Sequence, residues 1–208
     1  MSTMKPWRQV VTPHDDIRQG RFDASVFAAN LGHVIAGRGA VDYRDAQTFF
    51  SKTYMTEGLS HLLRDMLQRV AGKAKPEAVI QLQTPFGGGK THTLLSMYHL
   101  LNSPQESARV DCVKAILQGA GLKEVPKASV AALVGNALNV HEDRTLWGEM
   151  AYQLGGDKLY QMLVRDDQAK TAPGTKRLGE VLDAAGPCVI LIDETLAYLL
   201  NASGVKMG

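Results

Sequence analysis

The sequence predicts an α/β fold with three layers, in which helices cover both faces of a parallel sheet. Three observations carry this prediction. A short apolar run at residues 78–80 leads through a glycine-rich turn into a helical pattern. A second apolar run, residues 188–192, ends in two carboxylates, and helical patterns alternate with apolar runs between the two. We expect residues 1–75 to form a mostly helical N-terminal segment, and residues 76–208 to form the α/β core with an incomplete sheet.

The first strongly periodic stretch is residues 59–70, where apolar side chains recur at i, i+3, i+4 and i+7. This period predicts an amphipathic helix, and Thr56 is placed to cap it. Residues 72–76 then form a linker into the first expected strand. That strand begins at Ala78 and runs through Thr84, because a residue before proline is held in extended geometry.

Later elements follow from the same periodicities and from glycine and proline punctuation. A buried strand is expected wherever a short apolar run is bounded by turn residues. In chain order, the remaining expected elements are a helix over 94–101, a helix over 106–118, a strand over 129–134, a helix over 147–154 broken at Gly155 and Gly156, a short helix from Asp157, a helix around 178–182 and a strand over 188–192.

The stretch from Gln81 to Thr93 reads QLQTPFGGGKTHT, and its order of strand, glycine turn, Lys-Thr and helix is that of a phosphate-binding P-loop. Consecutive glycines allow several backbone N–H groups to face one anion, and the helix adds the positive end of its dipole. Lys90 is expected against the β- and γ-phosphates, and the Thr91 hydroxyl on Mg²⁺. Thr84 occupies the first glycine position of the usual pattern. The alternative is a surface glycine turn followed by a helix.

We therefore expect ATP to be bound along the loop and the start of the helix. The expected nucleotide contacts are Phe86, Gly87, Gly88, Gly89, Lys90, Thr91 and His92.

The second motif is the run from Cys188 to Glu194, read as CVILIDE. Its carboxylates lie at the carboxyl end of a predicted buried strand, which is where open α/β sheets bind ligands. Asp193 is suited to hold Mg²⁺ through water, and Glu194 to polarise the attacking water. Alone, such a pair is usually a solvated strand end. Together with the loop it predicts a nucleotide site with ATP and Mg²⁺ as cofactors, and Lys90 and Glu194 as the catalytic residues.

Composition sets modest limits on function. The net charge of +2 is too small to argue for a nucleic-acid-binding surface. Two cysteines, Cys112 and Cys188, imply no disulfide framework. No stretch has the length and hydropathy of a membrane span, and residues 1–11 lack the apolar core of a signal peptide. We expect a cytoplasmic protein without membrane association.

Four blocks, KPWRQVVTPHDDI, TPFGGGKTHT, RTLWGEMAYQLGG and GPCVILIDE, together resemble large prokaryotic AAA+-like ATPases of phage-defence islands. These are encoded beside DNA methyltransferases and are similar in style to the BREX P-loop proteins. The resemblance implies the N-terminal ATPase region of a longer protein, with Lys90, Thr91, Asp193 and Glu194 carrying the nucleotide chemistry. It also implies a homo-oligomer, with DNA or a methyltransferase as a partner of the full-length protein.

Three functions remain open at this point. The first is an ATPase that remodels a partner or nucleic acid, with hydrolysis in the full-length protein and little or none in these 208 residues. The second is a nucleotide-binding regulatory scaffold with slow or absent hydrolysis. The third is a small-molecule kinase, which Glu194 directly after Asp193 disfavours because it supplies a base for water. We expect a sensor residue and an arginine finger to lie outside these residues.

The division of P-loop proteins with a base directly after the Mg²⁺ aspartate places another strand between the two motif strands. We therefore expect no ladder of hydrogen bonds between Val79–Gln83 and Val189–Ile192. Such a ladder would raise the kinase hypothesis.

Overall fold

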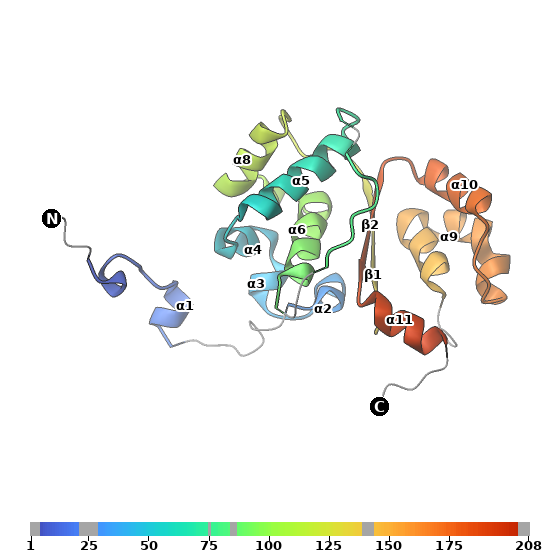
Figure 1. Cartoon of the computed structure of the whole chain (residues 1–208), viewed down its shortest axis with the longest axis horizontal. Helices are drawn as coiled ribbons and strands as arrows, with labels where there is room; N and C mark the ends of the chain where they lie inside the picture. The colour runs from blue at the N-terminus through green and yellow to red at the C-terminus, as the bar shows by residue number, and fades with distance from the viewer. Residues whose placement is uncertain (1–4, 21–28, 75, 84–86, 139–143, 204–208) are drawn as a thin grey trace.

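The computed structural model of the chain describes residues 5–20, 29–74, 76–83, 87–138 and 144–203. Within these ranges the chain forms one short 3₁₀ helix, α-helices and two β-strands (Figure 1). The helices are η1 (Trp7–Gln9), α1 (Asp15–Arg18), α2 (Leu31–Ile35), α3 (Val41–Arg44), α4 (Ala46–Lys52), α5 (Glu57–Val70), α6 (Lys90–Asn102), α7 (Pro104–Ser107), α8 (Asp111–Gly119), α9 (Leu146–Gln168), α10 (Thr175–Ala185) and α11 (Thr195–Ala202).

The two strands are β1 (Ser129–Val134) and β2 (Cys188–Asp193), and they pair in parallel. Their register runs from Ser129 opposite Cys188 to Val134 opposite Asp193. Both strands and their parallel pairing agree with the prediction. Because the strands are parallel, their carboxyl ends lie at the same edge of the sheet.

The described part of the fold is mixed α and β, with helices on both faces of this small sheet (Figure 1). One hydrophobic cluster contains side chains of α2, α4, α5, α6 and α8 together with Ala132 and Leu191. The other contains side chains of α9 and α10 together with Ala131 and Leu133. Neighbouring residues of β1 enter opposite clusters because successive side chains of a strand point to opposite faces.

The first cluster joins both of the regions expected from the sequence. Phe49 and Leu63 come from residues 1–75, whereas Leu95 and Leu191 come from residues 76–208, and all four are buried. The N-terminal helices α4 and α5 therefore share a core with α6 and the sheet.

Two helix predictions are confirmed in detail. The Thr56 hydroxyl accepts a hydrogen bond from the Leu59 N–H at 3.2 Å and caps α5. Helix α9 is interrupted where predicted, since Gly155 and Gly156 have non-helical backbone angles. Gly156 has φ +63°, a backbone conformation that residues with a side chain rarely adopt.

The predicted strand over residues 78–84 is wrong for its described part, because residues 78–83 have no regular structure. Val79 is 85% exposed and Ile80 is 44% exposed. Among the described residues β2 pairs only with β1, and the stretch joins neither strand. An isolated strand leaves its backbone groups unpaired and is not stable. Thr84, where the strand was expected to end, lies outside the described residues.

The expected absence of a ladder between Val79–Gln83 and Val189–Ile192 does agree with the structure, although the first segment is not a strand.

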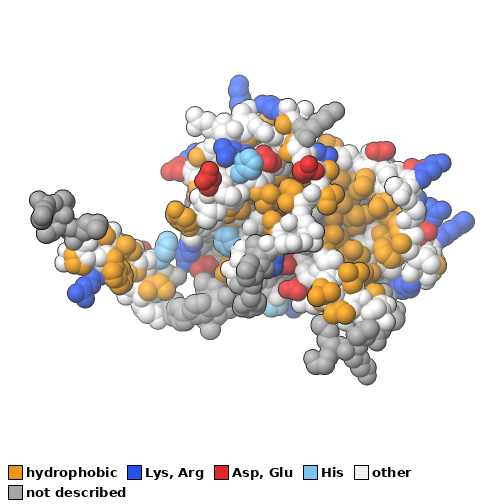
Figure 2. All heavy atoms as spheres, viewed as in Figure 1, with side chains coloured by type: hydrophobic (Ala, Val, Ile, Leu, Met, Phe, Trp, Pro, Cys, Tyr) orange, Lys and Arg blue, Asp and Glu red, His pale blue; other side chains and the backbone are white. Residues whose placement is uncertain are grey.

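Figure 2 shows hydrophobic side chains gathered across the middle of the face it presents. Ile192 in β2 is itself 38% exposed.

The single helix predicted over residues 106–118 is instead two helices, α7 and α8. Ser107, at the end of α7, is buried, and its hydroxyl donates to the His99 carbonyl of α6 at 3.0 Å. This bond ties α7 to the end of α6. The chain then turns, and α8 packs against α5.

Candidate functional site

The glycine turn before α6 has the backbone conformation that only glycine adopts easily. Gly87 has φ +78° and Gly89 has φ +77°, with Gly88 between them. Gly89 is the N-cap of α6, and no side chain of the described residues caps this helix end. A Cβ at either position 87 or 89 would meet nothing within 4 Å, so the requirement is conformational rather than steric. The chain therefore bends sharply just before the first amides of α6.

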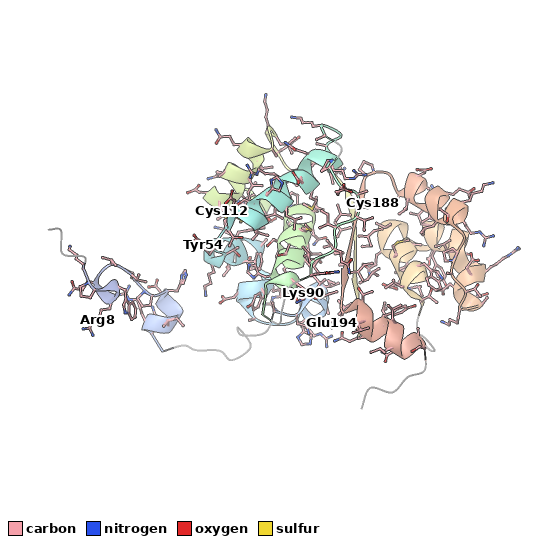
Figure 3. The ribbon with its side chains drawn as sticks, in the orientation of Figure 1. Arg8, Tyr54, Lys90, Cys112, Cys188 and Glu194 are labelled. Atoms are coloured by element: carbon pink, nitrogen blue, oxygen red, sulfur yellow. The ribbon has the colours of Figure 1, made fainter. Side chains whose placement is uncertain are left out.

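Lys90 and Thr91 are the first two residues of α6. The Thr91 hydroxyl donates a hydrogen bond to Asp193 Oδ2 at 2.9 Å. The two residues are 102 positions apart in the chain, and the contact joins the glycine turn to the end of β2. Figure 3 shows Lys90 at the start of α6 and Glu194 at the start of α11, at the same end of the molecule.

Asp193 is the last residue of β2, and both of its carboxylate oxygens have partners. Oδ2 accepts from Thr91, and Oδ1 accepts from the Glu194 N–H at 3.1 Å. The carboxylate is therefore held between the strand end and the start of α6.

Glu194 has an unusual backbone, with φ +53° and ψ +39°. This left-handed conformation is uncommon for residues other than glycine and marks a turn with a structural requirement. Glu194 is the N-cap residue of α11, and its side chain is exposed. The turn places residue 194 at the carboxyl edge of the sheet, directly after Asp193.

His92 was expected to contact the nucleotide, and its ring is engaged with the N-terminal helices. Its Nε2 lies 3.0 Å from the Thr53 hydroxyl, and its ring centroid lies 4.5 Å from that of Phe49. Burial lowers the pKa of His92, and the nearby His99 lowers it further. A nucleotide contact by His92 stays a prediction. Phe86, the first expected contact, lies outside the described residues.

The hydrogen-bond partners define which nitrogen of each histidine carries a proton. The Thr53 hydroxyl donates to the Phe49 carbonyl at 2.7 Å, so it can only accept from His92. His99 Nε2 lies 2.7 Å from the Tyr43 carbonyl, which also can only accept. Both rings therefore carry their proton on Nε2.

Residues 144–156, one of the blocks of the resemblance, form a support for the sheet. Arg144 lies over the Tyr152 ring at 3.7 Å and pairs with Glu149 at 3.0 Å. Gln153 donates to Glu149 at 2.9 Å and accepts from the Ala132 N–H at 2.8 Å. The side chain of Gln153 therefore satisfies a backbone donor at the edge of β1 that does not pair with β2.

A second anchor holds the start of α9. The buried Asp167 carboxylate accepts from the Thr145 N–H at 2.7 Å and from the Tyr160 hydroxyl at 2.9 Å. Gly148 is required here because a Cβ would lie 2.1 Å from Asp167 Oδ1.

Sequence reasoning missed Gly135, which contacts the backbone of Glu194. The signal was present, since Gly135 follows β1 directly, as Glu194 follows β2. Parallel strands that end together place the residues after them side by side.

No helix in the described residues has both the length and the apolar character needed to span a membrane. The same residues contain no group of three or more His, Cys, Asp or Glu side chains that could hold a metal ion.

Residues 5–207 match the family model described as the DUF499 N-terminal domain, and the chain therefore belongs to this family. The description names an N-terminal domain, which is consistent with a region of a larger protein, and it assigns no activity. No curated protein and no solved structure matches the chain.

Proposed function

We propose that the chain is a Mg-ATP-binding module that hydrolyses ATP in the context of the full-length protein. The observation that carries the proposal is the hydrogen bond from Thr91 to Asp193. It brings together the two sequence motifs that nucleotide chemistry requires, although they lie 102 residues apart. The alternative, a surface glycine turn and a solvated strand end, does not require any contact between the two motifs.

The phosphates would be bound by the backbone of residues 87–91. The positive φ values of Gly87 and Gly89 supply the bend before the helix. The first turn of a helix directs backbone N–H groups toward its N-terminal end, where they can bind an anion, and α6 begins directly after this bend. Lys90 adds a positive charge at the same helix end, where it would contact the β- and γ-phosphates.

The donor atoms at the helix start fit a magnesium ion. Thr91 and Asp193 offer a hydroxyl and a carboxylate that already lie within hydrogen-bond distance, and Mg²⁺ prefers oxygen ligands. Mg²⁺ is commonly held by one or two protein oxygens together with the nucleotide phosphates. A bound Mg²⁺ would neutralise charge on the phosphates. Thr91 and Asp193 are the residues that would hold it.

Glu194 is the general base of the proposal. Its carboxylate is exposed at the carboxyl edge of the sheet, directly after Asp193. There it would orient a water molecule and accept its proton. Lys90 would stabilise the charge on the transferred phosphoryl group.

The pairing of the strands bears on the kinase alternative. A ladder between residues 79–83 and β2 would have favoured it, and the described residues have no such ladder. The regulatory scaffold differs from the proposal only in turnover. A role in phage defence or in DNA-associated remodelling, with an oligomer and a DNA or methyltransferase partner, is proposed from the resemblance alone.

The proposal is tested by ATP hydrolysis in the full-length protein, measured with and without DNA and at graded Mg²⁺. We expect Mg²⁺-dependent phosphate release that is lost in Lys90→Ala and in Asp193→Asn. Mg-ATP binding without turnover in the parent protein under all of these conditions would favour the regulatory scaffold. No binding at all would contradict the proposal.

A further inference from the structure

Gly135 lies directly after β1 and contacts the backbone of Glu194. Its N–H donates to the Asp193 carbonyl at 2.9 Å, which continues the ladder one residue beyond β1. Gly135 is buried. A Cβ at this position would lie 2.2 Å from the Glu194 carbonyl oxygen and 2.9 Å from the Glu194 carbonyl carbon. The next nearest atom, Tyr198 Cβ, would lie at 3.0 Å.

The Glu194 carbonyl is also held from its other side. It accepts from the Ala197 N–H at 3.1 Å and from the Tyr198 N–H at 3.4 Å, in the first turn of α11. The peptide that carries the left-handed Glu194 is thus enclosed between Gly135 and the start of a helix. It cannot move away from position 135 without disturbing this turn.

The requirement for glycine at position 135 comes from Glu194 and not from the backbone of Gly135 itself. The φ angle of Gly135 is not positive, so the backbone at position 135 could accommodate alanine. Cβ atoms in proteins essentially never approach another heavy atom within 3.0 Å, and this Cβ would lie at 2.2 Å. Alanine at position 135 would therefore require its Cβ and the Glu194 carbonyl oxygen to separate by about 0.8 Å or more, through a shift of either backbone.

We infer that Gly135 is a positioning residue that determines where the Glu194 carboxylate lies, and that it affects hydrolysis rather than nucleotide binding. The inference rests on the proposed function. A general base must lie within hydrogen-bond reach of its water, and a displacement of about 1 Å can reduce a rate about a hundredfold. The three atoms that a Cβ at position 135 would meet most closely belong to Glu194 and Tyr198, and none belongs to Lys90, Thr91 or Asp193. The Gly135 N–H also donates to the Asp193 carbonyl, and alanine would keep this main-chain bond.

The test compares steady-state ATP hydrolysis and Mg-ATP binding in the full-length protein and in Gly135→Ala. We expect kcat to fall at least tenfold in Gly135→Ala, with KM and the Mg-ATP affinity unchanged within about threefold. The double variant Gly135→Ala with Glu194→Gln is expected to be no slower than Glu194→Gln alone, because both changes remove the same contribution. The matched control is Gly179→Ala in α10, where a Cβ meets nothing within 4 Å and φ is not positive. It should retain the parental kcat.

A second variant covers the case in which Gly135→Ala does not fold. Glu194→Asp keeps the charge and suits a left-handed backbone, but it withdraws the carboxylate by one methylene group. We expect at least a tenfold lower kcat with unchanged Mg-ATP affinity. A parental kcat in Glu194→Asp, or in a folded Gly135→Ala, would overturn the inference while leaving the proposed function intact. A parent protein that binds ATP without hydrolysing it would overturn both, and the parental measurement alone identifies that outcome.

Discussion

The Thr91 hydroxyl donates to Asp193 Oδ2 at 2.9 Å, from the start of α6 to the end of β2. Because both residues are anchored in regular structure, the contact defines the distance between the glycine turn and the carboxyl edge of the sheet. The proposed Mg-ATP site requires this contact, because the glycine turn and Asp193 must lie together to bind one nucleotide.

Thr91→Val should weaken Mg-ATP binding, because it removes the hydroxyl and keeps the shape of the side chain. A hydrogen bond to a charged group contributes about 1.5–3 kcal/mol, so the affinity should fall about tenfold or more. The loss should be much smaller for ATP without Mg²⁺. Thr175→Val, at the start of α10, serves as the control. Equal losses with and without Mg²⁺ would contradict a role for Thr91 at the metal.

Glu194→Gln should retain Mg-ATP affinity and lose hydrolysis, because it removes the base and leaves the side chain nearly the same size. General-base catalysis contributes about 10²–10⁴-fold, which sets the expected loss in kcat. The measurement is phosphate release under saturating Mg-ATP. A parental rate in this variant would show that Glu194 merely ends a strand.

The protein should become less stable as the pH falls below about 6.5, in part because of His99. Burial of this ring lowers its pKa from the ordinary value of 6.5, although the Tyr43 carbonyl and Asp45 oppose the shift. The unfolded chain therefore binds a proton at a pH at which the folded chain does not. His99 thus disfavours unfolding above its unfolded pKa, and this contribution is lost as the pH falls through 6.5 and toward the lowered folded value.

The check is denaturant unfolding of the parent and of His99→Gln between pH 8 and pH 5. The variant should be less stable at pH 8, and its stability should depend less on pH over this range. His92 also has a lowered pKa and will contribute to the slope that remains. An unchanged slope in His99→Gln would contradict the assignment.

At pH 8, His92 and His99 should both be neutral with the proton on Nε2. The Tyr43 carbonyl can only accept a hydrogen bond from His99. The Thr53 hydroxyl donates its proton to the Phe49 carbonyl, so it accepts from His92. Nitrogen-15 NMR of the imidazole rings distinguishes the two tautomers. A proton on Nδ1 of His92 would mean that the Thr53 hydroxyl does not donate to the Phe49 carbonyl while accepting from His92.

Much of the fold could be predicted because its signals are local. Residues 129–134 and 188–193 are short apolar runs between turn residues, and both are strands. Thr56 and the glycine pair at 155–156 define helix boundaries through their own backbone chemistry. These features depend on neighbouring residues, which a sequence displays directly.

What failed depends on partners that are distant in the chain. The run at residues 78–80 has the composition of a strand, but a strand requires a paired neighbour, and this run pairs with neither β1 nor β2. The helix expected at 106–118 is divided, since Val110 has an extended backbone and α8 begins after it. For the candidate site, Lys90, Thr91, Asp193 and Glu194 are readable as motifs. The contacts of Gly135 and of the His92 ring arise only from packing.

The most direct test of the central claim is isothermal titration calorimetry of Mg-ATP with the full-length protein and with Lys90→Ala. We predict one nucleotide site in the parent and at least about tenfold weaker binding in the variant, since a charged contact to the phosphates is lost. Lys114→Ala, at an exposed lysine of α8, should bind as the parent does. Equal affinity in the parent and in Lys90→Ala would contradict nucleotide binding at the glycine turn.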